Sequence, residues 1–338
     1  MKGPGRFPLV GLVIMASVLK IPSRRDFIAV GAAFGLQGAI AGAQSPPART
    51  AVRVSSAPDE DILGTLWGIQ SGSFKKTNLD VDLRLSNSGA AVAASVIGGS
   101  IDIGKSSLFS LIAAHLRGLP ITLVAAAAVY DTKVPTVGLI VKKGSPIRTA
   151  ADLNGKTISV QALNDQYAVA VKAWSDQHGG DSTSLHFLEL PNSAAADAID
   201  AGRVDAGATT NPILSEAIAG GKVQEIGHPF DGIGRYFIQA AYFCTNDYAR
   251  DNRDTIERFA RALEESSAYV NGHHAQTAAA LSTFTKVPLD VIEHMTRTQL
   301  ATKIDPAAIQ PVIDTAFKYK AIDKTFDAKE MIAPFMLR

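Results

Sequence analysis

Residues 99–107 read GSIDIGKSS, and residues 202–210 read GRVDAGATT, at a constant offset of 103 positions. An alanine-rich stretch precedes each copy, and a glycine opens it. Alanine favours a helix and glycine ends one, whereas the alternating apolar residues that follow are typical of a short strand. Each copy therefore predicts the same unit: a helix that ends at glycine, a strand, and a loop that carries small hydroxyl residues.

Strand and helix signals alternate around both copies. Residues 51–129 predict four strands with three helices between them, and the last strand is the continuous apolar run ITLVAAAAV at 121–129. Such a run is typical of a parallel strand that is buried on both faces. The alternation starts again at residue 156, after a Gly-Ser-Pro break at 144–146. We therefore expect an α/β protein with two lobes, each a mainly parallel sheet flanked by helices.

The expected lobes are discontinuous in the chain. We assign residues 50–140 and 237–338 to lobe I and residues 141–236 to lobe II, with the apolar segment 236–244 as the strand that returns. In open α/β sheets, ligands bind at the carboxyl ends of the strands, where the next helix presents free N–H groups and the positive end of its dipole. Two such edges that face each other form a cleft, and two independent domains are the alternative.

The first 43 residues have the character of an export signal. They hold five basic residues and one acidic residue, and Ser23–Ile28 (SRRDFI) resembles a twin-arginine motif. An apolar run at 28–41 follows, and small residues at 41–43 suit cleavage before Gln44. The run is too short and too rich in glycine and alanine for a good spanning helix. We expect residues 1–43 to be a twin-arginine signal peptide and the protein to be periplasmic; an uncleaved membrane anchor is the alternative.

Composition excludes several classes of protein. The 338 residues are 46% apolar and 19% charged, which is typical of a globular protein large enough for two domains. Beyond residue 43 the chain has 28 basic and 31 acidic residues and no basic stripe with interleaved aromatics, so we expect no nucleic-acid partner. A single cysteine, Cys244, excludes an internal disulfide and cysteine-rich metal sites. We expect no cofactor and no bound metal.

Five segments carry a resemblance to a known family: 71–83 (SGSFKKTNLDVDL), 86–107, 145–160, 198–212 and 245–263. In order and spacing they resemble the periplasmic solute-binding proteins of ABC importers, in the NMT1/SsuA-like branch for nitrate, sulfonate, taurine and pyrimidine precursors of thiamine. The resemblance implies a two-lobed periplasmic-binding-protein fold of type II with the ligand cleft between the lobes. It implies a monomer that captures a small organic solute, sulfonate-like, taurine-like or another small organic acid. The partners would be a permease and its ATPase in the inner membrane.

Other functions remain as alternatives. The ligand could instead be a pyrimidine or another amino or heterocyclic compound, or the chain could be an envelope sensor subunit of the same fold. We do not expect an enzyme and assign no catalytic residue, because the motifs of metalloproteases, serine hydrolases and nucleotide-binding folds are absent from the sequence. Fungal pyrimidine synthases resemble the family, but they use a cysteine-rich iron motif that a chain with one cysteine cannot supply.

The candidate ligand-binding residues of lobe I lie where strands are expected to end and helices to begin. Lys105 could pair with a sulfonate, phosphate or carboxylate, or extend its ammonium group to solvent. The serines could contact the ligand or act only as helix N-caps. These candidates are Asp59, Ser88, Gly89, Lys105, Ser106 and Ser107.

Lobe II departs from the family at residues 161–169, where many members hold an anion with Gly-Ser or Ser-Ser at a helix start. Asp165 is there instead, either as a helix N-cap or as an inward charge that would repel an anion and favour an amine or amide. Tyr167 and Tyr236 could stack on a ring of the ligand or belong to the core. We expect Asp102 and Asp205, within the two repeated phrases, to bond nearby backbone groups. The candidates of lobe II are Asn164, Asp165, Gln166, Tyr167, Thr209, Thr210, Asn211 and Tyr236.

Overall fold

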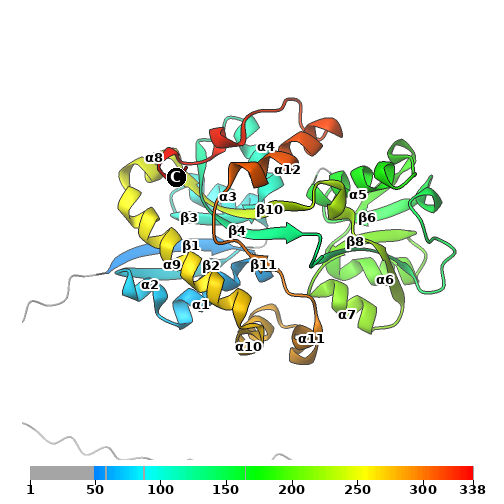
Figure 1. Ribbon diagram of the computed structural model, residues 1–338, viewed down its shortest axis with the longest axis horizontal. Helices are drawn as coiled ribbons and strands as arrows, with labels where there is room; N and C mark the ends of the chain where they lie inside the picture. The colour runs from blue at the N-terminus through cyan, green and yellow to red at the C-terminus, as the bar shows by residue number, and fades with distance from the viewer. Residues whose placement is uncertain (1–48, 58, 87, 164, 338) are drawn as a thin grey trace, which may run out of the picture. The chain divides into compact units, whose positions relative to one another are not determined.

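The structure is a computed structural model that describes residues 49–57, 59–86, 88–163 and 165–337. The expected signal peptide at 1–43 and the candidate Asn164 lie outside these residues. The described chain forms two β-sheets flanked by helices (Figure 1). Within these ranges, no helix combines the length and the apolar character that a membrane span requires.

The first sheet has six strands in the order β11-β4-β10-β3-β1-β2. Its strands are β1 (Thr50–Ser56), β2 (Leu79–Leu85), β3 (Ile103–Ser107), β4 (Ile121–Asp131), β10 (Tyr236–Thr245) and β11 (Gln299–Leu300). The elements of this part are η1 (Glu60–Ile62), α1 (Leu63–Gln70), α2 (Ser73–Lys76), α3 (Gly89–Ile97), α4 (Leu108–Leu116), α8 (Asn246–Asp251), α9 (Arg253–Gly272), α10 (His274–Thr285), α11 (Leu289–His294), α12 (Pro306–Lys318), η6 (Ala328–Met331) and η7 (Pro334–Met336).

The second sheet has five strands in the order β7-β6-β8-β5-β9. They are β5 (Val137–Lys142), β6 (Thr157–Val160), β7 (His186–Glu189), β8 (Ala206–Thr210) and β9 (Val223–Gly227). The expected boundary at 140/141 falls inside β5, which pairs in this sheet from Val137 onward, opposite Thr210. The change of sheet therefore comes before Val137. The helices here are η2 (Ala151–Leu153), α5 (Gln166–Gln177), η3 (Ser182–Ser184), η4 (Asn192–Ala194), α6 (Ala195–Asp200), α7 (Ile213–Ala219) and η5 (Pro229–Gly232).

Both sheets are mixed rather than mainly parallel. β1 runs parallel to β2 and β3, and β6 runs parallel to β7 and β8. The apolar strand β4 is buried along its first ten residues, but it pairs antiparallel with β10, which also separates it from β3. Burial on both faces explains a continuous apolar run whichever way the strand runs, so the run did not define its direction. The expected α/β class with two sheets is confirmed.

The two copies of the repeated phrase have the same local structure. The opening glycine of each has a positive φ, 71° and 69°, which suits the residue that ends a helix. In the first copy, residues 99–107, the backbone N–H of Asp102 donates to the Arg53 carbonyl at 2.9 Å, and Asp102 Oδ2 accepts from the Arg53 N–H at 2.7 Å. Asp205 makes the same pair of bonds with Thr157, at 2.8 and 2.9 Å. The prediction that both aspartates bond nearby backbone is confirmed.

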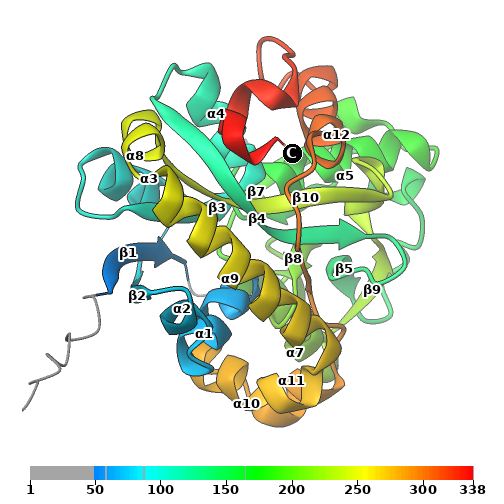
Figure 2. The ribbon, with the colours of Figure 1, turned by 60° about the vertical axis from the view of Figure 1, so that its left-hand side comes forward.

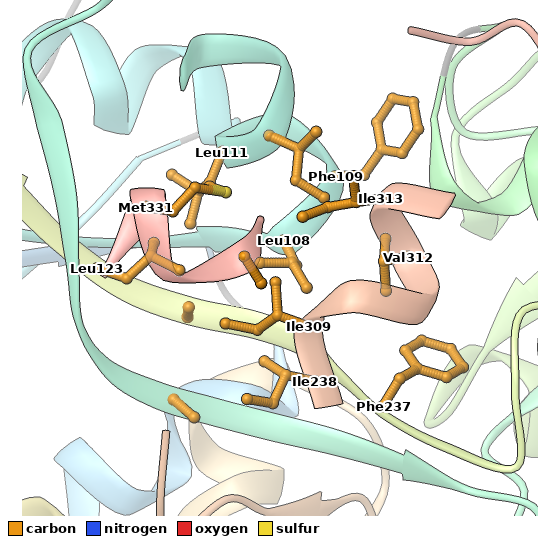
Figure 3. Packing of buried hydrophobic residues seen from close by; sticks show 14 of the residues in the cluster. Leu108, Phe109, Leu111, Leu123, Phe237, Ile238, Ile309, Val312, Ile313 and Met331 are labelled. Carbon is orange, nitrogen blue, oxygen red and sulfur yellow. The ribbon is translucent and has the colours of Figure 1, made fainter. Parts of the chain in front are cut away.

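Apolar side chains cover both faces of the first sheet. On one face, Leu108 of α4, Ile309 and Ile313 of α12 and Ile238 of β10 point toward one another (Figure 3). On the other face, α9 lies beside α1 and α2 and buries Phe259 against the strands (Figure 2). Full burial of a side chain of this size contributes about 1.5–3 kcal/mol. The strands whose carboxyl ends carry the candidate residues are therefore anchored on two sides.

Candidate functional site

The hydroxyl residues of the repeated phrases are the last residues of strands and not a loop after them. Lys105–Ser107 end β3, and Thr209 and Thr210 end β8. The strands extend this far because each has an antiparallel neighbour: Ser106 pairs opposite Ala241 of β10, and Thr209 pairs opposite Gly138 of β5. The expected loop is wrong in this respect, but the side chains still lie at the carboxyl edges of the two sheets.

Lys105 is buried between two carboxylates. Its side chain is 2% exposed, and Nζ lies 2.5 Å from Asp59 Oδ1 and 3.7 Å from Asp61 Oδ2. The alternative in which the ammonium reaches solvent is therefore wrong. Burial by itself lowers the pKa of Lys105, but the two carboxylates outweigh burial and raise it. The lysine is thus charged at neutral pH, and the three groups together can carry one net negative charge.

Asp61 is a site residue that sequence reasoning missed. Its side chain is 18% exposed, whereas that of Asp59 is 44% exposed. Burial raises the pKa of Asp61 to about 7, with smaller increases from Asp59 and Glu60, although Lys105 acts in the opposite direction. A run of three acidic residues directly after β1 was the available signal. Asp61 therefore changes its charge near neutral pH.

Glu60, between these two aspartates, belongs to a second buried ion pair. Arg297 Nε donates to Glu60 Oε1 at 2.5 Å, and the Thr298 N–H donates to Oε2 at 3.0 Å. Burial raises the pKa of Glu60, and the charge of Arg297 opposes this increase. Sequence reasoning missed the pair because its members lie 237 positions apart.

Asp165 caps the start of α5. Its two carboxylate oxygens accept the N–H groups of Ala168 and Ala162, each at 2.9 Å. Burial raises the pKa of Asp165 to about 6, although these backbone bonds favour the charged form. Its interpretation as an N-cap is therefore confirmed, and both of its oxygens are engaged by the backbone.

Tyr167 of α5 packs against two core clusters, one with residues of the first sheet and one with residues of the second. It follows the first residue of α5, and its ring lies 5.3 Å from that of Phe230, tilted by 49°. Burial raises the pKa of its hydroxyl, and the charges of Asp165 and Asp61 act in the same direction. The start of α5 therefore joins the cores of the two sheets.

Two candidate serines act as N-caps on the surface. Ser88 Oγ accepts the Ala91 N–H at 3.2 Å at the start of α3, and Ser107 Oγ accepts the Ser110 N–H at 3.3 Å at the start of α4. Both serines are exposed. Their N-cap interpretation is confirmed, and it is compatible with a ligand contact.

Ser106 differs from both neighbouring serines. It is 4% exposed, and its hydroxyl has no hydrogen-bond partner within the described residues. A side-chain carbon added to Gly89, the first residue of α3, would collide with this hydroxyl. Gly89 therefore leaves room beside Ser106 at a helix start, and a buried polar group without a partner is uncommon enough to need an explanation.

The candidates of β8 and α5 divide into engaged and free side chains. Asn211 is engaged: Oδ1 accepts from the N–H and hydroxyl of Ser215, and Nδ2 donates to the Thr296 carbonyl at 2.8 Å. Thr209 and Gln166 are buried, and in the described part of the chain neither Thr209 Oγ1 nor Gln166 Oε1 has a hydrogen-bond partner. Unsatisfied hydroxyl and amide groups are thus present on the second sheet as well.

Tyr236 does not lie with the other candidate residues. It is 53% exposed and lines a separate groove of about 770 Å³ together with α9 and the segment at 301–306. Lys105 and the other described candidates do not line this groove. Tyr236 was a candidate because its ring could stack on a ligand, but it opens β10 and pairs with the far end of β4, at Asp131.

The described residues give no sign of metal or thiol chemistry. Across the described ranges, no group of three or more His, Cys, Asp and Glu side chains could hold a metal ion. Cys244 is buried in β10, and burial raises the pKa of its thiol to about 12. A thiol with this pKa is protonated at neutral pH and is therefore a poor nucleophile.

The fold is that of the periplasmic binding proteins. The structure aligns with the periplasmic aliphatic sulphonate binding protein SsuA from Escherichia coli with a TM-score of 0.70, over 86% of this chain and 92% of that chain, at 21% identity. The NMT1/THI5-like family matches residues 59–277. The chain belongs to this family, and the resemblance noted in the sequence is confirmed.

Two curated relatives have different activities. A protein of Escherichia coli K12 described as an aliphatic sulfonates-binding protein is 26% identical over 240 residues, which are 69% of this chain and 73% of the relative. The 4-amino-5-hydroxymethyl-2-methylpyrimidine phosphate synthase THI11 of Saccharomyces cerevisiae is 23% identical over 221 residues, 59% of this chain and 60% of the relative. The chain is thus similar both to a protein named as a binding protein and to one named as an enzyme.

Proposed function

We propose that this protein is the substrate-binding subunit of an ABC importer. It captures a small organic solute between the carboxyl edges of its two sheets and delivers it, as a monomer, to a membrane permease and its ATPase. The observation that carries the proposal is that the two edges meet: Asn211, directly after β8, donates to the Thr296 carbonyl beside Arg297, which holds Glu60 between Asp59 and Asp61. Polar groups at helix starts from two sheets can hold one ligand and favour a closed form when it binds.

We propose that the ligand carries both a positive and a negative group, as taurine does. Asp59 and Asp61 share the single ammonium of Lys105, so their remaining negative charge can receive an amine of the ligand. The Ser106 hydroxyl has no partner within the described residues and adjoins Gly89, the first residue of α3, where free N–H groups and the helix dipole favour an anion. An aminosulfonate or a small amino acid has both features.

Titration calorimetry with three matched compounds tests this ligand class. Taurine has both groups, ethanesulfonate lacks the amine, and ethylamine lacks the sulfonate. We expect taurine to bind at least tenfold more tightly than either analogue, because a charge-assisted hydrogen bond contributes about 1.5–3 kcal/mol. Equal affinity for taurine and ethanesulfonate would refute the amine subsite. Recovery of the bound compound unchanged after long incubation separates binding from catalysis.

A double variant tests the placement of the site. Ser106→Ala with Asn211→Ala removes a free hydroxyl on the first sheet and an amide on the second. We expect ligand affinity to fall by more than tenfold, because the ligand would lose the Ser106 hydroxyl and the site would lose the bond between Asn211 and the Thr296 carbonyl. Ser110→Ala, near the exposed cap of α4, is the matched control. An unchanged affinity in the double variant would mean that the ligand binds elsewhere.

One observation favours a second ligand class. The ring of Tyr167, tilted against Phe230, adjoins in sequence Gln166, whose buried Oε1 has no partner within the described residues, and an aromatic ring with a free acceptor nearby suits an aminopyrimidine. The relative named as a pyrimidine phosphate synthase supports this candidate. The same titration should therefore include 4-amino-5-hydroxymethyl-2-methylpyrimidine. Binding tenfold tighter than that of taurine would select the heterocycle.

We propose that the protein is exported to the periplasm by the twin-arginine route. The support is the sequence of Ser23–Ile28, which lies outside the described residues, and the fold that this chain shares with the periplasmic protein SsuA. Replacing Arg24 and Arg25 with lysine should leave the precursor uncleaved in the cytoplasmic fraction. Normal export of that variant would contradict the twin-arginine route.

A further inference from the structure

We infer that Arg297 is a positioning residue that couples the carboxylates of the site to the second sheet. The inference rests on the proposed function. Arg297 lies beyond residues 59–277, which match the family. It belongs to Thr296–Thr298, named here the return segment, which runs between α11 and β11 of the first sheet. This segment makes one set of contacts with each of the two sheets.

The contacts on the first sheet hold Glu60 on both of its oxygens. Arg297 donates to one oxygen at 2.5 Å and the Thr298 N–H donates to the other at 3.0 Å. The side chains of Glu60 and Arg297 are 2% and 4% exposed. Because Glu60 stands between Asp59 and Asp61 in the chain, the positions of both aspartates around Lys105 depend on this anchor.

The contact on the second sheet is made by the neighbouring residue. The Thr296 carbonyl accepts Nδ2 of Asn211, which directly follows β8, at 2.8 Å. The residue before Asn211 is Thr210, the last residue of β8, whose hydroxyl donates to the Thr136 carbonyl at 3.1 Å. A shift of β8 is therefore transmitted to the return segment, and through Arg297 to the acidic residues after β1.

The side chain of Arg297 has two hydrogen-bond partners that only an arginine can bond together. Besides Glu60, the guanidinium group donates through Nη1 to the His274 carbonyl at 3.3 Å. A lysine has the same charge, but its ammonium is a single point on a flexible stem and does not reproduce the planar fork of donors. Breaking one side of a buried ion pair leaves an uncompensated charge. Arg297→Lys should therefore release Glu60 while the net charge stays the same.

Hydrogen exchange of the ligand-free protein tests the coupling without any ligand. In Arg297→Lys we expect amide exchange to rise at least tenfold both in a peptide that covers 59–64 and in one that covers 206–211. Asp102→Asn is the matched control, because it weakens a different ion pair of the first sheet, with Arg53. An increase confined to residues 295–300, or an equal increase in the control at both peptides, would overturn the inference.

A second pair of variants separates the two bonds of Asn211. Asn211→Asp keeps an acceptor for Ser215 but loses the donor to Thr296, whereas Ser215→Ala loses only the Ser215 hydroxyl. We expect Asn211→Asp to weaken taurine binding at least fivefold and Ser215→Ala by less than twofold. Equal effects of the two variants would overturn the coupling. If no compound of the panel binds the unmodified protein, the proposed ligand class fails, and hydrogen exchange alone decides the role of Arg297.

Discussion

Replacing Lys105 with methionine should change how the stability of the protein depends on pH. At 3.7 Å from Asp61, the ammonium attracts the carboxylate by about 4 kcal/mol for an effective dielectric constant of about 20. This attraction opposes the burial that raises the pKa of Asp61 to about 7. Without the attraction to Lys105, the pKa of Asp61 rises further. The native variant then keeps a proton at pH 8 that the unfolded chain, with an aspartate pKa of about 3.9, has released.

The direction of the effect follows from proton counting. Where the native state binds more protons than the unfolded state, the free energy of unfolding falls as pH rises, by up to about 1.4 kcal/mol per pH unit for one proton. In the unmodified protein the fall caused by Asp61 ends slightly above pH 7, because the native carboxyl has then also ionised. In Lys105→Met this fall continues above pH 7. The difference in the free energy of unfolding between the unmodified protein and the variant should therefore grow by about 2–3 kcal/mol between pH 7 and pH 9.

Urea denaturation at pH 6, 7, 8 and 9 measures this difference. At pH 6 we expect the variant to be close to the unmodified protein, because removing a buried ammonium also removes its desolvation cost. Lys222→Met is the matched control, since Lys222 is 54% exposed and pairs with surface carboxylates. Stability curves of Lys105→Met and the unmodified protein that run parallel from pH 7 to pH 9 would refute the assigned coupling between Lys105 and Asp61.

Three further predictions concern the site and the repeated phrase. Gly89→Ala should change the free energy of unfolding by less than about 1 kcal/mol, because the unbonded Ser106 hydroxyl can rotate away from the added methyl group. The same variant should lower taurine affinity at least tenfold in calorimetry. A large loss of stability with normal taurine binding would contradict this prediction. In urea denaturation, Asp102→Ala should lower the free energy of unfolding by about 2–3 kcal/mol and Asp205→Ala by about 1 kcal/mol. The difference is expected because Asp102 accepts three hydrogen bonds and is less exposed than Asp205. A larger loss in Asp205→Ala would be inconsistent with these contacts. Taurine affinity should rise from pH 6 to pH 8 as Asp61 loses its proton, and Asp61→Asn should flatten the profile; a profile unchanged by that substitution would exclude Asp61 as the titrating group.

Much of the fold could be predicted because its signals are local. The helix that ends at Gly99 and the helix that starts after Asp165 follow from residues within one or two turns. The direction of β4 and the existence of β11, which has two residues, could not be predicted in this way. β4 pairs with β10 on one side and with β11 on the other, and both partners come from more than one hundred positions further along the chain.

The candidate site shows the same division. Lys105 was found because it ends a strand, and the carboxyl ends of strands meet at one edge of a sheet. Its burial between Asp59 and Asp61 could not be predicted, because a lysine in a loop and a lysine at a strand end look alike in sequence. The role of Arg297 had no sequence signal, since its partner Glu60 is distant and no spacing rule connects them.

The aspartate bonds of the two repeated phrases separate stability from recognition. Asp102 and Asp205 tie each strand to its parallel neighbour before the strand reaches its last two residues. That bond does not need the last two residues of each strand, which are Ser106 and Ser107 on one sheet and Thr209 and Thr210 on the other. If the solute binds at the proposed site, substitutions there change which solute is bound while the backbone beneath keeps its register. A lineage of such proteins could therefore acquire new specificities through a few exchanges at these four positions, while the bonds of Asp102 and Asp205 stay in place.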